Sequence, residues 1–332
     1  MKNTFIDLNK NDTFSNLRGL DLQDLLLQIQ GYLLEYRDKL YLSDNLTFGA
    51  EIEYEGLSKL IADKFVNKNL KEWGSDIDGS LKSGGEIISP VMTDNIKCWQ
   101  ELKTICDYLA KKKVNTLDRA GGHIHIGTCI LGDDIDAWCL FLKLYAVYES
   151  VIFRFIYGDK INARYGMQKY APPLADLIHE IIFIIDRQSD LVKISHYLPR
   201  FDRYHAINFS NVLFYSPNDN SVKNTIEFRS PNATTNAIIW QNNINMFAKI
   251  LMSSKRKKID VDYLNYELKY DFISYKGNEY MYNTINLKKA LEFVDLVFDN
   301  NLDKVYFLRQ YIKNYQDGYG LQNTVKAKKF TR

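Results

Sequence analysis

The chain has 332 residues, enough to bury the core of one large domain or of two ordinary ones. Its 43 basic and 41 acidic residues nearly cancel, which excludes a general electrostatic affinity for polyanions such as nucleic acids. Hydrophobic residues make up 46% and charged residues 25%, as in ordinary globular proteins, so composition does not indicate a fibrous or disordered chain.

The cysteines and the apolar segments bear on the cellular compartment. The four cysteines form no Cys-x-x-Cys pair, and we expect free thiols in a reducing cytoplasm. The most apolar segment, 178–185, is interrupted by His179 and Glu180, and no apolar run is long enough to span a bilayer. These features predict a cytoplasmic protein without a membrane partner.

The predicted elements mix helices and strands without a regular βαβ alternation. Residues 1–20 lack a clear pattern, and we expect an extended or loosely docked arm there. Apolar residues at helical spacing predict helices over 21–40, 57–66, 93–113, 133–157, 174–186, 234–252, 287–298 and 302–315. Strands are expected over 48–55, 123–127, 203–209 and 225–231, with two short ones within 73–90. This mixture predicts an α+β fold with an antiparallel sheet.

Carboxylates recur at every second position of the strand expected over 48–55. Glu51, Glu53 and Glu55 would lie on one face of that strand, while Ile52 and Tyr54 would face the core. Adjacent carboxylates repel one another and are costly to desolvate, which favours a bound cation that neutralises them. The alternative is an amphipathic strand whose polar face is simply hydrated.

Three further strand-like segments carry charged groups of related kinds. Each contributes one pair: Asp78 with Glu86, His123 with His125, and Glu227 with Arg229. Each pair alone is common in proteins without a metal ion, but their occurrence on successive strands is not. Carboxylates with imidazoles and without thiolates suit hard divalent cations such as Mg²⁺ or Mn²⁺.

The sequence and order of these segments resemble the amidoligase family, a branch of the carboxylate–amine ligases with the glutamine synthetase fold. The matching motifs are Phe-Gly-Ala-Glu-Ile-Glu (48–53), Asp-Gly-Ser-Leu (78–81), Gly-Gly-Glu-Ile-Ile-Ser-Pro (84–90), Gly-Gly-His-Ile-His-Ile-Gly (121–127), Arg-Tyr-His-Ala-Ile-Asn (203–208) and Ile-Glu-Phe-Arg-Ser-Pro (226–231). The resemblance implies a curved antiparallel sheet flanked by helices. It divides the chain into an N-terminal arm and helix (1–45), a catalytic core (46–252) and a mainly helical C-terminal extension (253–332).

The resemblance also implies roles for individual residues. Glu53, Asp78 and Glu86 would hold the divalent ion nearest the substrates. Glu51, His123 and Glu227 would hold a second ion at the β- and γ-phosphates of ATP. His125 would lie close to these phosphates, and Arg203 and Arg229 would neutralise the transferring phosphoryl group. Asp78 stands where glutamine synthetases have a longer Glu, so a water-bridged contact or a role in orienting the amine stays open there.

The activity that the resemblance implies is ATP-dependent ligation of a carboxylate to an amine through an acyl phosphate, with ADP and phosphate as products. The substrates would be found among amino acids, peptides, polyamines and protein side chains. Three alternatives stay open: a metal-dependent hydrolase, a guanidino kinase of the same fold, and a catalytically decayed binding protein. The Glu-x-Glu and His-x-His pairs argue against the kinase, and a hydrolase would not need the two arginines.

Overall fold

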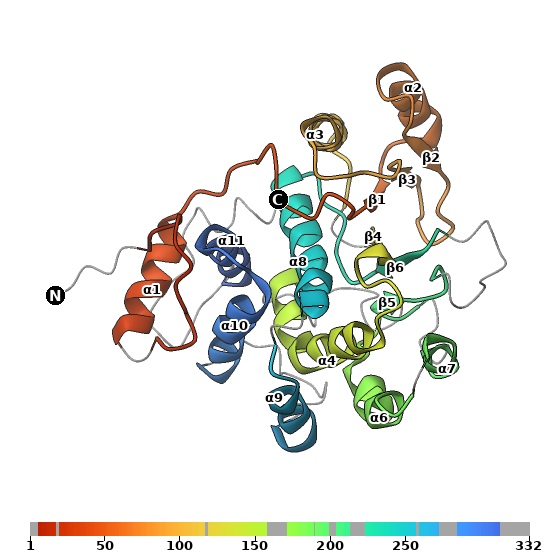
Figure 1. Cartoon of the computed structure of the whole chain (residues 1–332). Helices are drawn as coiled ribbons and strands as arrows, with labels where there is room; N and C mark the ends of the chain where they lie inside the picture. Colours follow the sequence, from red (N-terminus) through yellow and green to blue (C-terminus); the bar gives the residue numbers. More distant parts are fainter. Residues whose placement is uncertain are drawn as a thin grey trace.

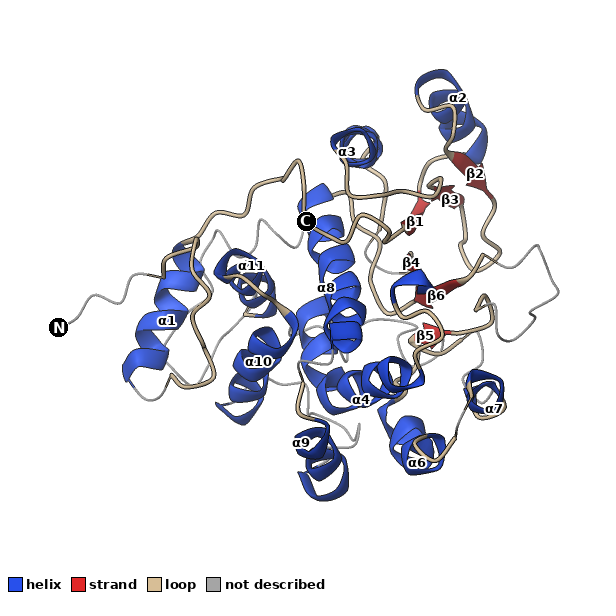
Figure 2. Cartoon of the chain, viewed as in Figure 1, coloured by secondary structure: helices blue, strands red, loops and turns tan. Residues whose placement is uncertain are grey.

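The computed structural model has an α+β fold, with an antiparallel sheet on one side and a layer of helices beside it (Figures 1 and 2). The structure describes residues 6–17, 20–116, 119–157, 171–188, 190–198, 204–212, 223–256, 259–271 and 284–312. The α+β prediction is therefore confirmed. No helix among these residues is long and apolar enough to cross a membrane.

The sheet has six strands in the order β2-β3-β1-β4-β6-β5, and every neighbouring pair is antiparallel. The strands are β1 (Phe48–Glu55), β2 (Gly74–Asp76), β3 (Gly84–Ile88), β4 (Gly122–Gly127), β5 (Ile207–Asn208) and β6 (Thr225–Phe228). Ile52 and Tyr54 of β1 are fully buried, as the alternation predicted, so the carboxylates of this strand lie on the opposite face. β5 is shorter than the strand expected over 203–209, of which residue 203 lies outside the described residues.

All eight predicted helices have counterparts among the described residues; the first ends at Gly31 rather than at residue 40, and the other described ends differ from the prediction by a few positions. The helices are α1 (Leu20–Gly31), α2 (Lys59–Asn69), α3 (Ile96–Lys111), α4 (Ile135–Tyr157), α6 (Ala175–Ile185), α7 (Leu191–Ser195), α8 (Ala237–Arg256), α9 (Val261–Tyr266), α10 (Thr284–Val297) and α11 (Asn301–Tyr311). Short helical turns at Thr128–Ile130 and Glu267–Asp271 were not predicted. Helices α4 and α8 lie between the sheet and the pair α10 and α11 (Figure 1).

Aromatic side chains fill the space between the sheet and the helices. Phe228 of β6 stacks on Phe247 of α8, with ring centroids 4.0 Å apart, and meets Phe141 of α4 edge-on at 6.3 Å. At the start of the interior strand β1, Phe48 stacks on Trp99 of α3 at 4.9 Å. Because this face carries the core, the charged face of the sheet is left to form a site.

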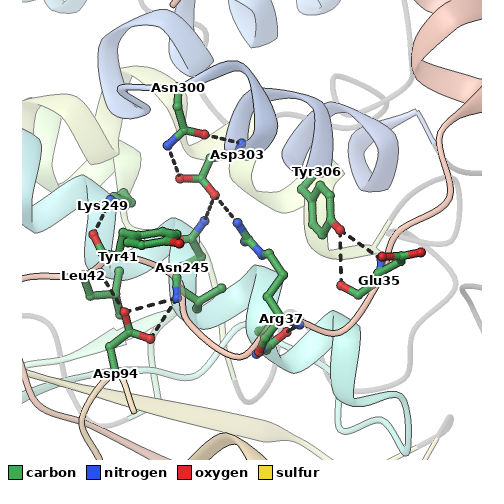
Figure 3. A network of polar contacts seen from close by, with 12 residues as sticks. Glu35, Arg37, Tyr41, Leu42, Asp94, Asn245, Lys249, Asn300, Asp303 and Tyr306 are labelled. Carbon is green, nitrogen blue, oxygen red and sulfur yellow. Dashed lines mark hydrogen bonds and ion pairs between the residues drawn. The ribbon is translucent and has the colours of Figure 1, made fainter. Parts of the chain in front are cut away.

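The segment between α1 and β1 is not helical, although a helix was expected as far as residue 40. Its backbone N–H groups bond instead to side chains of other elements: Arg37 N donates to Gln241, and Leu40 N donates to Asp94. The Arg37 guanidinium pairs with the fully buried Asp303 carboxylate at 2.7 Å (Figure 3). Asn245 of α8 also donates to Asp303, at 2.9 Å. These bonds satisfy the backbone without a helix and fasten the segment to α8 and α11.

The N-terminal arm is held more firmly than the sequence predicted. Phe14 is 2% exposed, and its backbone N–H donates to the carboxylate of Asp295 on α10. Lys304 of α11 bonds both to the Asp295 carboxylate at 2.7 Å and to the carbonyl oxygen of Asp12 at 2.6 Å. The described part of the arm, 6–17, is thus docked on the C-terminal helices.

Candidate metal and active site

The register of the sheet brings the four charged segments together on one face. In the antiparallel pairing, Glu51 lies opposite His123, and Glu53 lies opposite Glu86. Glu227 lies opposite His125 on the next strand. Directly opposed residues of an antiparallel pair are close enough for their side chains to interact. Pairs that are far apart in the sequence therefore become neighbours.

The first group, which we call cluster A, consists of Glu51, His125 and Glu227. One ligand atom from each lies within 4.8 Å of the others. His125 Nε2 lies 3.0 Å from Glu51 Oε1, and His125 Nδ1 lies 3.3 Å from the hydroxyl of Thr225. Both ring nitrogens of His125 thus have partners that fix the orientation of the imidazole.

The second group, cluster B, consists of Glu53, Asp78 and Glu86, whose ligand atoms also lie within 4.8 Å of one another. Glu53 is only 4% exposed, and burial raises the pKa of its carboxyl group even though its Oε2 accepts a bond from Gly121 N. Burial and the neighbouring charges of Glu51 and Asp78 raise the pKa of Glu86 to about 7. Cluster B is therefore a site of uncompensated negative charge.

His123 lies between the two clusters. Its Nδ1 is 3.2 Å from Glu51 Oε2 and 3.6 Å from Glu227 Oε1, while its Nε2 is 3.5 Å from Glu53 Oε1. Burial alone would lower the pKa of His123, but the hydrogen bond with Glu51 and the other carboxylates raise it overall. Burial likewise raises the pKa of Glu51, but its bonds with His123 and His125 outweigh burial and lower it.

The sequence implied His123 as the partner of Glu51 and Glu227, with His125 nearer the phosphates. The structure brings both imidazoles to these two carboxylates: His123 Nδ1 lies 3.2 Å from Glu51 Oε2 and 3.6 Å from Glu227 Oε1, and His125 joins the same two residues in cluster A. Both imidazoles lie on the charged face, as the alternation predicted. The sequence could not decide between them, because residues two apart on a strand share a face and only the cross-strand register distinguishes them.

Two further polar residues hold Glu227 in place. Arg229 NH1 donates to Glu227 Oε1, and Asn208 Nδ2 donates to Glu227 Oε2 at 2.7 Å. Asn208 is 4% exposed and lies opposite Glu227 in the register of β5 and β6. Asn208 ends one of the matching motifs, but its sequence context did not predict a role for it in the site. Arg203 lies outside the described residues.

At Gly121 the backbone lies close to Glu53 of cluster B and to His123. A Cβ atom at this position would lie 2.9 Å from His123 Nε2 and 3.2 Å from Glu53 Oε1. Both distances are tighter than ordinary contacts, so a side chain here would displace the groups that face the site. In the sequence, this glycine stood out only as the first residue of the motif at 121–127.

Two cavities lie at opposite ends of β1, and each shares lining residues with one of the clusters. Cavity A has a volume of about 260 Å³, and cavity B a volume of about 560 Å³. Cavity A is lined by Thr47, Phe48, Gly49, Ala50, Glu51, Ile88, Ser89, Pro90, Val91, His125, Lys223 and Thr225. Cavity B is lined by Gly56, Leu57, Ser58, Lys59, Ile77, Asp78, Leu81, Lys82, Ser83 and Gly84. Glu51 and His125 thus belong both to cluster A and to cavity A, and Asp78 belongs both to cluster B and to cavity B.

Comparison with known protein families gives a match over residues 56–251, more than half of the chain, to the family described as "Putative amidoligase enzyme". The chain belongs to the amidoligase family. A search of curated proteins finds no match. Amidoligase membership indicates a ligase-type enzyme that acts on a carboxylate and an amine. The matched region begins after Glu51 and Glu53, and the sheet register joins these two residues to the matched strands.

The ligand atoms of the two clusters fit divalent ions of the kind that an amidoligase would use. Cluster B offers carboxylate oxygens only, and cluster A offers carboxylate oxygens with one imidazole, which are donors that Mg²⁺ and Mn²⁺ accept. The missing side chain at Gly121 leaves room beside the Glu53 carboxylate. The raised pKa of Glu86 reflects burial and repulsion from neighbouring carboxylates, and a bound cation would relieve that repulsion.

Proposed function

We propose that this amidoligase is an ATP-dependent enzyme that joins a carboxylate to an amine through an acyl phosphate and releases ADP and phosphate. The observation that carries this proposal is the series of two cavities and two clusters along β1. ATP would bind in cavity A, and the carboxylate and the amine would bind in cavity B. The γ-phosphate and the substrate carboxylate would then meet between the clusters, beside His123.

The reaction that we propose has two steps. A carboxylate oxygen attacks the γ-phosphorus of ATP, and the bond from that phosphorus to the β,γ-bridging oxygen breaks, which releases ADP. The amine nitrogen then attacks the acyl carbon, loses a proton to a carboxylate of the enzyme, and expels inorganic phosphate. The route needs no covalent nucleophile from the protein.

Residues around cluster A have the chemistry that the first step requires. Arg229, which pairs with Glu227, would turn its guanidinium toward the transferring phosphoryl group. His125 lines cavity A, and Lys223, whose ammonium lies 3.9 Å from Glu51, adds a positive charge at its opening. We propose a phosphate contact for Arg203 as well. Mg²⁺ or Mn²⁺ in the two clusters would supply further positive charge to the transition state.

Residues around cluster B would serve the second step. Asp78 lies both in the cluster and in the lining of cavity B, which supports a role for its carboxylate in orienting the amine and accepting its proton. The Oδ1 atom of Asp78 accepts a bond from Ser80 N, which restricts the orientation of the carboxylate. The other oxygen is left for the cluster or the substrate.

Hydroxylamine provides a test that does not require the natural amine. Purified protein with Mg²⁺, ATP, hydroxylamine and a panel of carboxylates should give a hydroxamate together with ADP and phosphate. Formation of AMP and pyrophosphate would contradict the acyl-phosphate route. An absence of nucleotide turnover, combined with metal-dependent hydrolysis of an ester or amide, would favour the metal-dependent hydrolase instead.

A further inference from the structure

Cavity B has both acidic and basic residues in its lining, whereas cluster B, with which it shares Asp78, consists of carboxylates only. Among the residues in its lining, Asp78 is the carboxylate, and Lys59 and Lys82 are the cations. With Asp78 neutralised by an ion in cluster B and Lys59 paired with Asp63, Lys82 would give the cavity a net positive charge. Such a cavity favours an anionic ligand.

The position of Lys82 is fixed by the loop that carries it. Its backbone N–H donates to the carboxylate of Glu55 at 2.9 Å, and the next residue, Ser83, accepts a bond from Gly56 N at 2.9 Å. Both bonds tie the loop to the end of β1. Within the described ranges, no carboxylate pairs with the Lys82 ammonium, whereas Lys59 is paired with Asp63 at 2.8 Å. Lys82 is therefore the cation available to a ligand.

The size and the apolar lining of cavity B indicate what kind of anion fits. A volume of about 560 Å³ lies within the range typical of drug-sized ligands and leaves room for more than one amino-acid residue. Leu57, Ile77 and Leu81 contribute apolar surface, and Ile77 is 70% exposed. An extended chain with both apolar and charged groups matches this lining better than a small polar molecule does.

We propose that the carboxylate substrate is an acidic peptide, bound in cavity B with one carboxylate at the clusters and a second carboxylate paired with Lys82. This inference rests on the proposed ligase function and adds the substrate class to it. Lys82 acts here as a specificity-determining residue. It takes no part in phosphoryl transfer, so its loss alters substrate choice rather than the chemical step.

The test compares two peptides that differ by one charge. Ala-Glu-Ala has two carboxylates, and Ala-Gln-Ala has one in a molecule of nearly the same shape. In the hydroxylamine assay, we expect the wild type to prefer Ala-Glu-Ala in kcat/KM. Lys82→Glu should lower kcat/KM for Ala-Glu-Ala by roughly five- to tenfold and change that for Ala-Gln-Ala by less than about twofold, because it replaces attraction by repulsion only for the second carboxylate.

Two control variants make the result specific. Lys82→Arg keeps the charge and should retain the preference for Ala-Glu-Ala. Lys68→Glu makes the same charge change at an exposed position of α2 that does not line cavity B, and it should leave both peptides unaffected. Equal use of the two peptides by the wild type, or an equal effect of Lys82→Glu on both, would overturn the inference while leaving the ligase function intact.

Direct binding separates failure of this inference from failure of the proposed function. If ATP were not turned over with any carboxylate, the ligase proposal would fail, and calorimetric titration of Ala-Glu-Ala in Mg²⁺ would decide the inference alone. Binding that Lys82→Glu weakens and Lys68→Glu does not would support an acidic-peptide site. No binding to the wild type would overturn it.

Discussion

Glu86 provides the sharpest test of the electrostatics of cluster B. Burial and the charges of Glu51 and Asp78 raise its pKa from the ordinary value of 4.5 to about 7. The folded protein therefore holds this proton more tightly than the unfolded chain does. The stability from this group is fully present below about pH 4.5 and is lost as the pH rises through about 7. In metal-free protein at pH 8, the ionised Glu86 thus destabilises the fold.

The size of this effect follows from the shift and from the exposure of the side chain. Each unit of pKa shift corresponds to about 1.4 kcal/mol, which sets a ceiling of about 3 kcal/mol. Glu86 is only half-buried, and solvent screening reduces the effect to about 1 kcal/mol. We therefore predict that Glu86→Gln raises the melting temperature of the metal-free protein by about 2 °C at pH 8. At pH 4.5 the wild type and Glu86→Gln should have the same melting temperature.

Thermal melts in EDTA and in Mg²⁺, each at pH 4.5 and pH 8, measure this prediction. Mg²⁺ should raise the melting temperature of the wild type at pH 8, and the gain should be much smaller for Glu86→Gln because one ligand is lost. Glu72→Gln is the control. The Glu72 side chain is 67% exposed, and its ion pair is with Lys97, which belongs to neither cluster. A lower melting temperature for Glu86→Gln in EDTA at pH 8 would refute the reasoning about repulsion.

Three further predictions, the first with a control substitution, test other parts of the structure. Asp303→Ala leaves Arg37 buried without its partner and should cost about 3–5 kcal/mol of unfolding free energy in urea melts. Asp107→Ala breaks an exposed ion pair of similar length and should cost less than about 1 kcal/mol, so equal losses would contradict the role of burial. Arg229→Lys should lower kcat about 100-fold and change the KM for ATP by less than about threefold, because the guanidinium fork acts on developing charge. An unaltered rate would indicate that Arg229 has only a structural role, in its ion pair with Glu227. Gly121→Ala should remove most of the Mg²⁺-induced rise in melting temperature, and a full rise would show that no ion lies beside this glycine.

The sequence predicted the helices and strands well wherever one face of an element is apolar. The alternation in β1 and β4 identified the charged face correctly. Successive side chains of a strand point to opposite faces, and this does not depend on which strands pair with it. The helices α7 and α9 were not predicted. Both are short, and the sequence feature that marks the start of each is a single Asp at the N-cap position. Asp190 accepts from Lys193 N, and Asp260 accepts from Asp262 N.

The grouping of the site residues could not be predicted from the sequence, because it depends on cross-strand register. Only the pairing of β1 with β3 sets Glu53 opposite Glu86, and only the pairing of β4 with β6 sets His125 opposite Glu227. Asn208 was not predicted either, because only the pairing of β5 with β6 sets it opposite Glu227. An Asn at the end of a strand does not by itself indicate a site. The helix expected as far as residue 40 was wrong beyond Gly31, because distant side chains bond to the backbone there.

The central claim is that the carboxylate attacks ATP and becomes an acyl phosphate, and an isotope transfer tests it most directly. The carboxylate that gives the most hydroxamate is labelled with ¹⁸O in both oxygens and turned over with ATP, Mg²⁺ and hydroxylamine. Mass spectrometry of the phosphate should find one ¹⁸O transferred per turnover, because the oxygen that bonds to phosphorus leaves with it. Label in AMP, or phosphate without label, would contradict the account.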